Sequence, residues 1–145
     1  MKTLREVMRP GFVRSVQRVA TVSAAARVMA SSNVGIVAVL DGDRLVGVFS
    51  ERDVVRRVVD RGLDPAATPV ERVMTSELVV ASADDDYQSA MRTMDSANIR
   101  HLPVVADGRL LSMLSIRDLM RVDLETKGQE IRYLTEYLYQ VPSGA

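Results

Sequence analysis

What the sequence lacks narrows the class of protein before any motif is considered. The 145 residues include no cysteine and one histidine, which excludes disulfides and thiolate chemistry and argues against a zinc site. Lysine plus arginine number 19, and so do aspartate plus glutamate. This balance lacks the basic excess of a dedicated nucleic-acid or membrane-surface binder. We therefore expect neither a nucleic acid nor a membrane as the main partner.

Long hydrophobic runs and aromatic residues are also scarce. The apolar run from Val34 to Leu40 is far below the ~20 residues that span a bilayer. The charged start, Met1 to Glu6, lacks the apolar stretch of a secretory signal. We expect a cytoplasmic protein. Since 47% of the residues are hydrophobic and only 4% aromatic, the chain should fold around a core of aliphatic side chains.

The chain contains an internal repeat. A shift of 65 residues aligns the segment 25–56 with 90–121 and gives 12 identities in 32 positions, where unrelated sequences would share roughly two. The identical residues of the first copy are Ala25, Arg27, Met29, Ser31, Asn33, Val39, Arg44, Leu45, Ser50, Arg52, Asp53 and Arg56. An internal repeat fixes the architecture before any local assignment. The chain is therefore two copies of one unit.

Each unit has the pattern helix, strand, strand, helix, behind a short extended piece. Apolar residues at three- and four-residue steps predict helices ending near Asn33 and Asn98, with Thr21 and the Asp84–Asp86 cluster as N-terminal caps. Two β-rich runs around Asp-Gly turns predict a hairpin in each copy. The fold class is α/β: repeats at 4–62 and 70–124, a linker at 63–69, and an amphipathic helix at 125–141. Because each repeat is too small to fold well alone, the two should pack as one pseudo-symmetric module.

Polar chemistry gathers in a repeated Ser-x-Arg-Asp motif where strand passes to helix, Ser50 to Asp53 and Ser115 to Asp118. Its spacing is that of a capping box, so helix capping alone could explain both copies. The same geometry suits a ligand. Free N–H groups at a helix start favour a phosphate, and a carboxylate one turn further on accepts hydrogen bonds from a ribose diol.

The repeated strand with Arg100-His101-Leu102-Pro103-Val104, the Asp-Gly turn and the Ser-x-Arg-Asp motif together resemble a tandem cystathionine-β-synthase-type (CBS) domain pair, the Bateman module. The resemblance covers residues 4 to 124. It implies clefts between the two repeats that bind an adenosine ligand, with Ser on the phosphate and Asp on the ribose. AMP, ADP, ATP, S-adenosylmethionine and NAD-type ligands all fit this implication, and no cofactor is required.

By this resemblance the candidate ligand-binding residues are Ser50, Arg52, Asp53, Arg100, His101, Pro103, Ser115, Arg117 and Asp118. The two copies depart from the family pattern at different points. The first has Ala38 where the family has proline, and the second has Ser112 where the family has glycine. Arg100 and His101 give the second copy more donors for a phosphate than the first copy has.

Three functions are compatible with these residues. The leading hypothesis is a regulatory module, not an enzyme, that binds an adenosine ligand and transmits its occupancy to an effector protein on another chain. The alternatives are a scaffold in which the Ser-Asp pairs only cap helices, and a ligand-gated regulator of a protein or nucleic acid. We also predict a homodimer, because the helices at 54–59 and 119–124 have more apolar positions than one buried stripe needs. The C-terminal helix either joins that interface or packs on its own domain.

Overall fold

The computed structural model describes residues 2–8 and 13–139. The first half of the chain contains α1 (Leu4–Val7), β1 (Ser15–Gln17), α2 (Val22–Ser32), β2 (Ile36–Asp41), β3 (Arg44–Ser50), α3 (Glu51–Asp53) and the π-helical η1 (Val54–Val59). The second half contains η2 (Val70–Arg72), α4 (Tyr87–Ala97), β4 (His101–Ala106), β5 (Arg109–Ser115) and α5 (Ile116–Tyr139). The two halves follow the same order, so the predicted repeat is confirmed.

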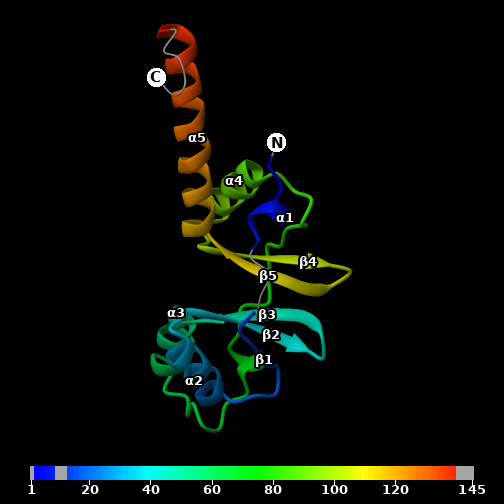
Figure 1. The fold of residues 1–145 in the computed structure, drawn as a ribbon. Coiled ribbons are helices and arrows are strands. Elements are labelled where there is room, and N and C mark those ends of the chain that lie inside the picture. The colour runs from blue at the N-terminus through cyan, green and yellow to red at the C-terminus, as the bar shows by residue number, and fades with distance from the viewer. Residues whose placement is uncertain (1, 9–12, 140–145) are drawn as a thin grey trace.

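The strands form one sheet in the order β1-β2-β3-β5-β4. β1 lies parallel to β2, and the two hairpins, β2–β3 and β4–β5, are antiparallel. The register between the two hairpins is limited to one residue pair, Arg44 with Arg109, so each repeat keeps its own half of the sheet (Figure 1). In the second repeat the leading strand is reduced to a parallel bridge between Ala81 and Val104. The predicted α/β class with two repeats is confirmed.

The predicted helix ends are present in both repeats. Thr21 accepts a hydrogen bond from the Ala24 N–H, and Asp86 accepts one from the Ser89 N–H, which satisfies N–H groups that the helix leaves free. Asn33 and Asn98 close α2 and α4 in the left-handed conformation, with φ of 53° and 54°. Side chains capable of local hydrogen bonding thus set the same helix boundaries twice.

The C-terminal part of the chain differs from the prediction. The structure has one continuous helix, α5, from Ile116 to Tyr139, where the sequence predicts a repeat helix followed by a separate helix from 125. Lys127 Nζ lies 2.8 Å from Asp123 Oδ2, an i,i+4 pair that spans the predicted boundary and supports helical continuity. Beyond the body α5 projects as a rod (Figure 1). The predicted end at Val141 lies outside the described residues.

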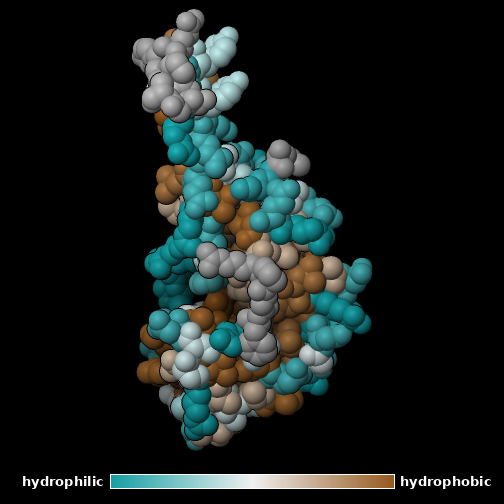
Figure 2. Space-filling model, viewed as in Figure 1, coloured by the Kyte–Doolittle hydropathy of each residue, from teal (hydrophilic) through white to brown (hydrophobic). Residues whose placement is uncertain are grey.

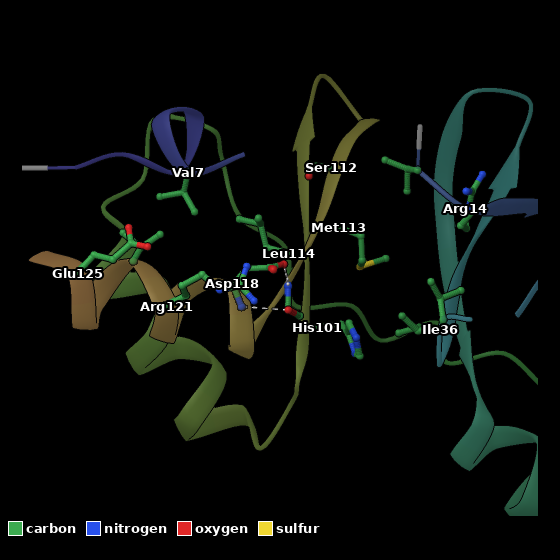
Figure 3. A pocket seen from close by; sticks show the side chains of 14 residues that line it. Val7, Arg14, Ile36, His101, Ser112, Met113, Leu114, Asp118, Arg121 and Glu125 are labelled. Atoms are coloured by element: carbon green, nitrogen blue, oxygen red, sulfur yellow. Dashed lines mark hydrogen bonds between the residues drawn. The ribbon is translucent and has the colours of Figure 1, made fainter. Parts of the chain in front are cut away.

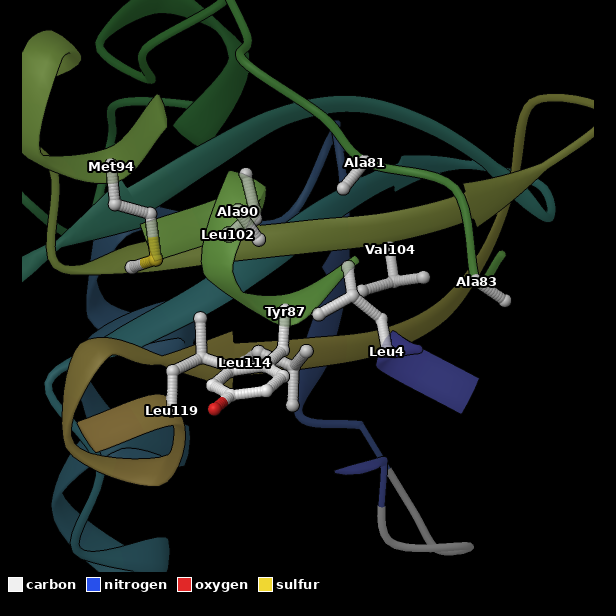
Figure 4. Close-up of a cluster of buried hydrophobic side chains, with 10 residues drawn as sticks. All are labelled: Leu4, Ala81, Ala83, Tyr87, Ala90, Met94, Leu102, Val104, Leu114 and Leu119. Atoms are coloured by element: carbon white, nitrogen blue, oxygen red, sulfur yellow. The ribbon is translucent and has the colours of Figure 1, made fainter. Parts of the chain in front are cut away.

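The hydrophobic cores do not follow the sequence repeats. Leu4 of α1 is fully buried in the core of the second repeat, which also contains Tyr87, Met94 and Leu119, and Figure 4 shows its side chain beside Val104 in this cluster. Val70, from the start of the second repeat, is fully buried in the first core, where Phe49 is the largest side chain. Each repeat therefore contributes its leading segment to the core of the other.

Backbone hydrogen bonds hold both exchanged segments. The Leu4 N–H donates to the Asp85 carbonyl at 2.8 Å, and the Val70 N–H donates to the Ala20 carbonyl at 2.7 Å. The predicted linker, 63–69, is also fastened, because the Val22 N–H donates to the carbonyl of buried Thr68. On the face shown in Figure 2, hydrophobic residues gather across the middle of the body, whereas α5 beyond it presents mostly hydrophilic residues. No helix among the described residues is long and apolar enough to cross a bilayer.

Candidate ligand-binding clefts

The second Ser-x-Arg-Asp motif lies where β5 ends and α5 begins. Ser115 Oγ accepts a hydrogen bond from the Asp118 N–H at 3.1 Å, and Asp118 Oδ2 accepts one from the Ser115 N–H at 3.0 Å. This is the predicted capping box. It uses one carboxylate oxygen of Asp118, and no described residue donates a hydrogen bond or forms an ion pair to the other, Oδ1. The cap therefore leaves an acceptor open.

Asp118 and Ser115 line a cavity of about 460 Å³. Val34 and Ile36 of the first repeat form its opposite wall, with Val13 and Arg14 from the segment before β1. In Figure 3, Ile36 and Arg14 face the β5 side of the cavity across the open space. A volume of this size is within the range of small-molecule sites. The cavity is a cleft between the two repeats, with most of its polar groups on the β5–α5 side and Arg14 on the opposite wall.

His101, at the start of β4, is the titratable ring of this cleft. Burial lowers the pKa of His101, the Asp118 carboxylate opposes that effect, and the Arg100 guanidinium adds to it. The imidazole is therefore neutral at neutral pH and offers one N–H donor and one acceptor. A bound anion next to this ring would raise its pKa again, because negative charge favours the protonated form.

The other predicted residues of the second copy do not line this cavity. Arg100 and Arg117 are exposed. Pro103 is buried in β4, and its carbonyl accepts a hydrogen bond from the Ala81 N–H at 2.9 Å. A proline fits there because β4 is the outermost strand of the sheet and, among the described residues, its outer edge carries only the isolated bridge to Ala81.

Several lining residues were not predicted from the sequence. Glu125 and Arg121 reach the cavity from the second and third turns of α5, and Arg14 and Val7 reach it from the N-terminal segment. The helical period could have indicated Arg121 and Glu125, since they follow Asp118 at three- and four-residue steps. No local pattern indicated Arg14 or Val7, because they enter the cleft through the exchange of leading segments.

The first motif has the same cap but a different environment. Asp53 Oδ2 accepts hydrogen bonds from the Ser50 N–H at 3.0 Å and from Ser50 Oγ at 3.2 Å. Its Oδ1 accepts a hydrogen bond from Thr75 Oγ1 at 3.4 Å and lies 3.5 Å from Arg57 Nε. Asp53 is only 7% exposed. Both of its oxygens are therefore bonded within the chain, and Arg52 of the same motif is exposed.

The segment that contains Thr75 is fixed against β3. Val48 and Thr75 exchange two backbone hydrogen bonds, of 2.9 and 3.0 Å, and Arg57 Nη1 donates to the Met74 carbonyl at 2.8 Å. The Met74 side chain covers Gly47, where an added Cβ would overlap its sulfur atom. The glycine that the family pattern places before the motif thus allows Met74 to pack directly on the strand.

The described residues of these clefts form no group that could hold a metal ion. Within residues 2–8 and 13–139, no three His, Asp or Glu side chains are grouped so as to hold a metal ion. Asp84 lies beside Arg5, with 3.4 Å between the carboxylate and the guanidinium, and Asp86 caps α4. The acidic cluster at 84–86 thus has a local structural role.

Comparison with known proteins gives the family. The sequence model of the CBS domain matches residues 4–60 and 70–125. The chain belongs to the CBS domain family, and its two repeats are the two domains of a tandem pair. An uncharacterized 17.7 kDa protein of Acidianus ambivalens is 36% identical over 107 residues, which are 72% of this chain and 63% of that protein. This chain therefore matches under two thirds of that relative.

Solved structures agree with this assignment. A CBS-domain containing protein from Agrobacterium tumefaciens superposes with a TM-score of 0.75 at 28% identity, over 84% of this chain and 99% of that one. A CBS domain protein from Pyrobaculum aerophilum, solved in complex with AMP, superposes with a TM-score of 0.72 at 33% identity. That match covers 81% of this chain and 89% of the other. The chain is thus a CBS-domain regulatory module by family and by fold.

Proposed function

We propose that the chain is a sensor that binds an adenine nucleotide in the cleft of Ser115 and Asp118. The observation that carries this proposal is the open Oδ1 of Asp118, which lines a cavity of about 460 Å³ beside the start of α5. A carboxylate oxygen can accept the ribose hydroxyls, and the helix start and His101 can face the phosphate. Val34, Ile36 and Val13 would pack against the base. The AMP complex of the Pyrobaculum protein supports this ligand class.

A binding role agrees better with these groups than a catalytic role. The cleft holds carboxylates, arginines, two serines, Ser112 and Ser115, and one neutral histidine. Ser115 Oγ accepts the Asp118 N–H of its own helix, and no general base is hydrogen-bonded to it among the described residues. Nucleophilic catalysis needs a base within hydrogen-bond reach of the nucleophile. We therefore assign the serine to helix capping and phosphate contact.

Thermal unfolding with a ligand panel tests the proposal. A ligand that binds only the folded state raises its stability by RT ln(1 + [L]/Kd), about 2.7 kcal/mol at 100 times Kd. We expect AMP, ADP or ATP to raise the unfolding midpoint, with S-adenosylmethionine, NADH and cyclic dinucleotides as competing ligands. Inorganic phosphate and GMP serve as controls for charge and base. A midpoint that none of these ligands moves would favour the scaffold alternative.

α5 provides a route from the cleft to a partner. Its first turns line the cavity through Asp118, Arg121 and Glu125, and it then leaves the body as one helix to Tyr139. Beyond the body Ile131, Leu134 and Leu138 are exposed. This exposure favours a stripe that joins an interface over one that packs on its own domain. A ligand that shifts the start of α5 would move its exposed end, because a helix transmits displacement along its axis.

We propose a homodimer that uses this exposed surface. Val55 and Val59 in η1 are 61% and 68% exposed, and their repeat counterparts in α5, Met120 and Leu124, are 49% and 69% exposed. From Leu124 the stripe continues at seven-residue intervals through Ile131 and Leu138. This is the period of helices that pair with like helices. The stripe is continuous with the apolar surface that both repeats expose at equivalent positions. A second copy of the chain carries the same surface and is therefore the partner that fits it.

Light scattering tests the dimer at tens of micromolar protein. We expect the intact chain to be dimeric and the double variant Val59→Glu/Leu124→Glu to be monomeric, because buried like charges oppose association. Tyr133→Glu, on another side of α5, is the matched control and should stay dimeric. A chain ending at Glu125 should associate more weakly. A monomeric intact protein would refute the dimer, and unchanged association after truncation would refute only the role of the C-terminal stripe.

A further inference from the structure

The two copies of the Ser-x-Arg-Asp motif have diverged in their surroundings. Asp118 keeps one oxygen open to a cavity, whereas both oxygens of Asp53 are bonded within the chain. The difference lies in the groups that approach the second carboxylate oxygen, Oδ1. Thr75 and Arg57 converge on Asp53 from the second repeat's leading segment and from η1. The repeat places Val122 where the first copy has Arg57, and valine has no group to offer the Asp118 carboxylate. The counterpart of Thr75 is position 9, which lies outside the described residues.

We infer that the motifs have separate roles: Asp118 binds the nucleotide, and Asp53 is a latch that fastens the start of the second repeat to the first. The chain then binds one nucleotide, not two. This inference rests on the proposed function and adds the stoichiometry and the identity of the working cleft. It reassigns Ser50 and Asp53 from ligand contacts to contacts within the chain.

Burial and steric packing both support the latch. Asp53 is 7% exposed, so a ribose could reach its carboxylate only after the segment 73–75 had moved. That segment is held by two backbone hydrogen bonds between Val48 and Thr75 and by the bond from Arg57 to the Met74 carbonyl. It is also anchored by Val73, which is 2% exposed in the first core. Opening the first cleft would therefore disrupt core packing as well as hydrogen bonds.

The bonding pattern predicts opposite effects of one substitution at the two positions. Asp→Asn retains one acceptor oxygen and replaces the other with an NH₂ donor. At Asp118 the remaining oxygen still completes the cap, so the unliganded protein should keep its midpoint while nucleotide affinity falls. At Asp53 both oxygens accept hydrogen bonds. In Asp53→Asn the new NH₂ group therefore faces the donors of Arg57 or Ser50, and those donors lose their acceptor. The unliganded protein should then lose stability while affinity is retained.

Titration calorimetry of the intact 145-residue chain with AMP, combined with thermal unfolding, tests the two assignments. We expect about one AMP per chain for the natural sequence. Asp118→Asn should weaken AMP by about tenfold or more. Asp53→Asn should keep Kd within about twofold and lower the unliganded midpoint by about 4 °C or more. Thr75→Val, which removes only one donor to Asp53, should lower the unliganded midpoint by a smaller amount. This variant replaces Asp53→Asn in the test if Asp53→Asn does not fold.

Two AMP per chain would overturn the inference and leave the proposed function intact. So would a folded Asp53→Asn or Thr75→Val protein that loses AMP affinity as strongly as Asp118→Asn. If the natural protein binds no adenine nucleotide, the proposed function fails and the assignment of the cleft fails with it. The latch is then judged by unfolding alone, and equal midpoints for Asp53→Asn and Asp118→Asn would refute it.

Discussion

Cutting the chain at Pro65 is expected to leave two fragments that do not fold as stable monomers. The fragment 1–65 loses Val70 and Val73 from its core, and the fragment 66–145 loses Leu4. A small domain has little apolar burial to spare. Mixing the fragments should restore the fold, because each supplies the segment that the other lacks. Circular dichroism and thermal unfolding of each fragment, alone and mixed, measure the effect.

A single substitution measures how much the exchanged N-terminal segment contributes to stability. Leu4→Ala should lower the free energy of unfolding by about 2–5 kcal/mol, the usual range for a buried leucine, although Leu4 lies near the N-terminus. Leu111→Ala is the matched control, since Leu111 is 39% exposed, and it should change stability by less than about 1 kcal/mol. Two independently folded, cooperatively melting fragments, or equal effects of the two substitutions, would contradict the exchanged-core interpretation.

Replacing Asp118 by alanine should weaken adenine nucleotide binding by about 1.5–3 kcal/mol, or roughly ten- to 150-fold, the range for hydrogen bonds to a charged group. The proposed partners of this carboxylate are the ribose hydroxyls. The natural protein should therefore bind 2′,3′-dideoxy-AMP more weakly than AMP, and Asp118→Ala should discriminate little between them. Titration calorimetry of the two proteins with the two ligands gives the coupling between carboxylate and hydroxyls.

The control for this cycle lies on the same helix. Asp123 accepts a hydrogen bond from the Tyr87 hydroxyl at 3.0 Å and pairs with Lys127, but it does not line the cavity. Asp123→Ala should keep nucleotide affinity within about twofold, even if stability falls. If Asp118→Ala binds AMP normally and loses only about 1 kcal/mol of stability, Asp118 is a helix cap and nothing more.

Much of the fold could be predicted because its signals are local and occur twice. The Asp-Gly turns, the caps at Thr21 and Asp86, and the left-handed Asn33 and Asn98 are all confirmed. Each depends on backbone conformation or on hydrogen bonds within a few residues, which short sequence patterns specify. The expected break before 125 was wrong. No helix-breaking proline stands there, and the Asp123–Lys127 pair supports the continuous helix.

The cleft was predictable only in part. Ser115 and Asp118 were found because a repeated motif marks them, and His101 because it stands in a strand that resembles the family pattern. Arg14 and Val7 were missed because their place depends on how the N-terminal segment crosses to the other repeat. The different surroundings of Asp53 and Asp118 were equally invisible. Identical motifs give identical caps, while the groups that approach the caps come from residues distant in sequence, such as Thr75.

Local sequence patterns specify the repeat, the order of helices and strands, and the residues that cap them, because these depend on periodicity and on contacts between near neighbours. Tertiary structure decided three further features. It placed Leu4 and Val70 in the opposite cores, it left one oxygen of Asp118 open to a cavity while both oxygens of Asp53 are bonded, and it left the stripe of α5 uncovered. Each of these depends on long-range packing, and side chains brought together from distant segments leave no periodic trace in the sequence.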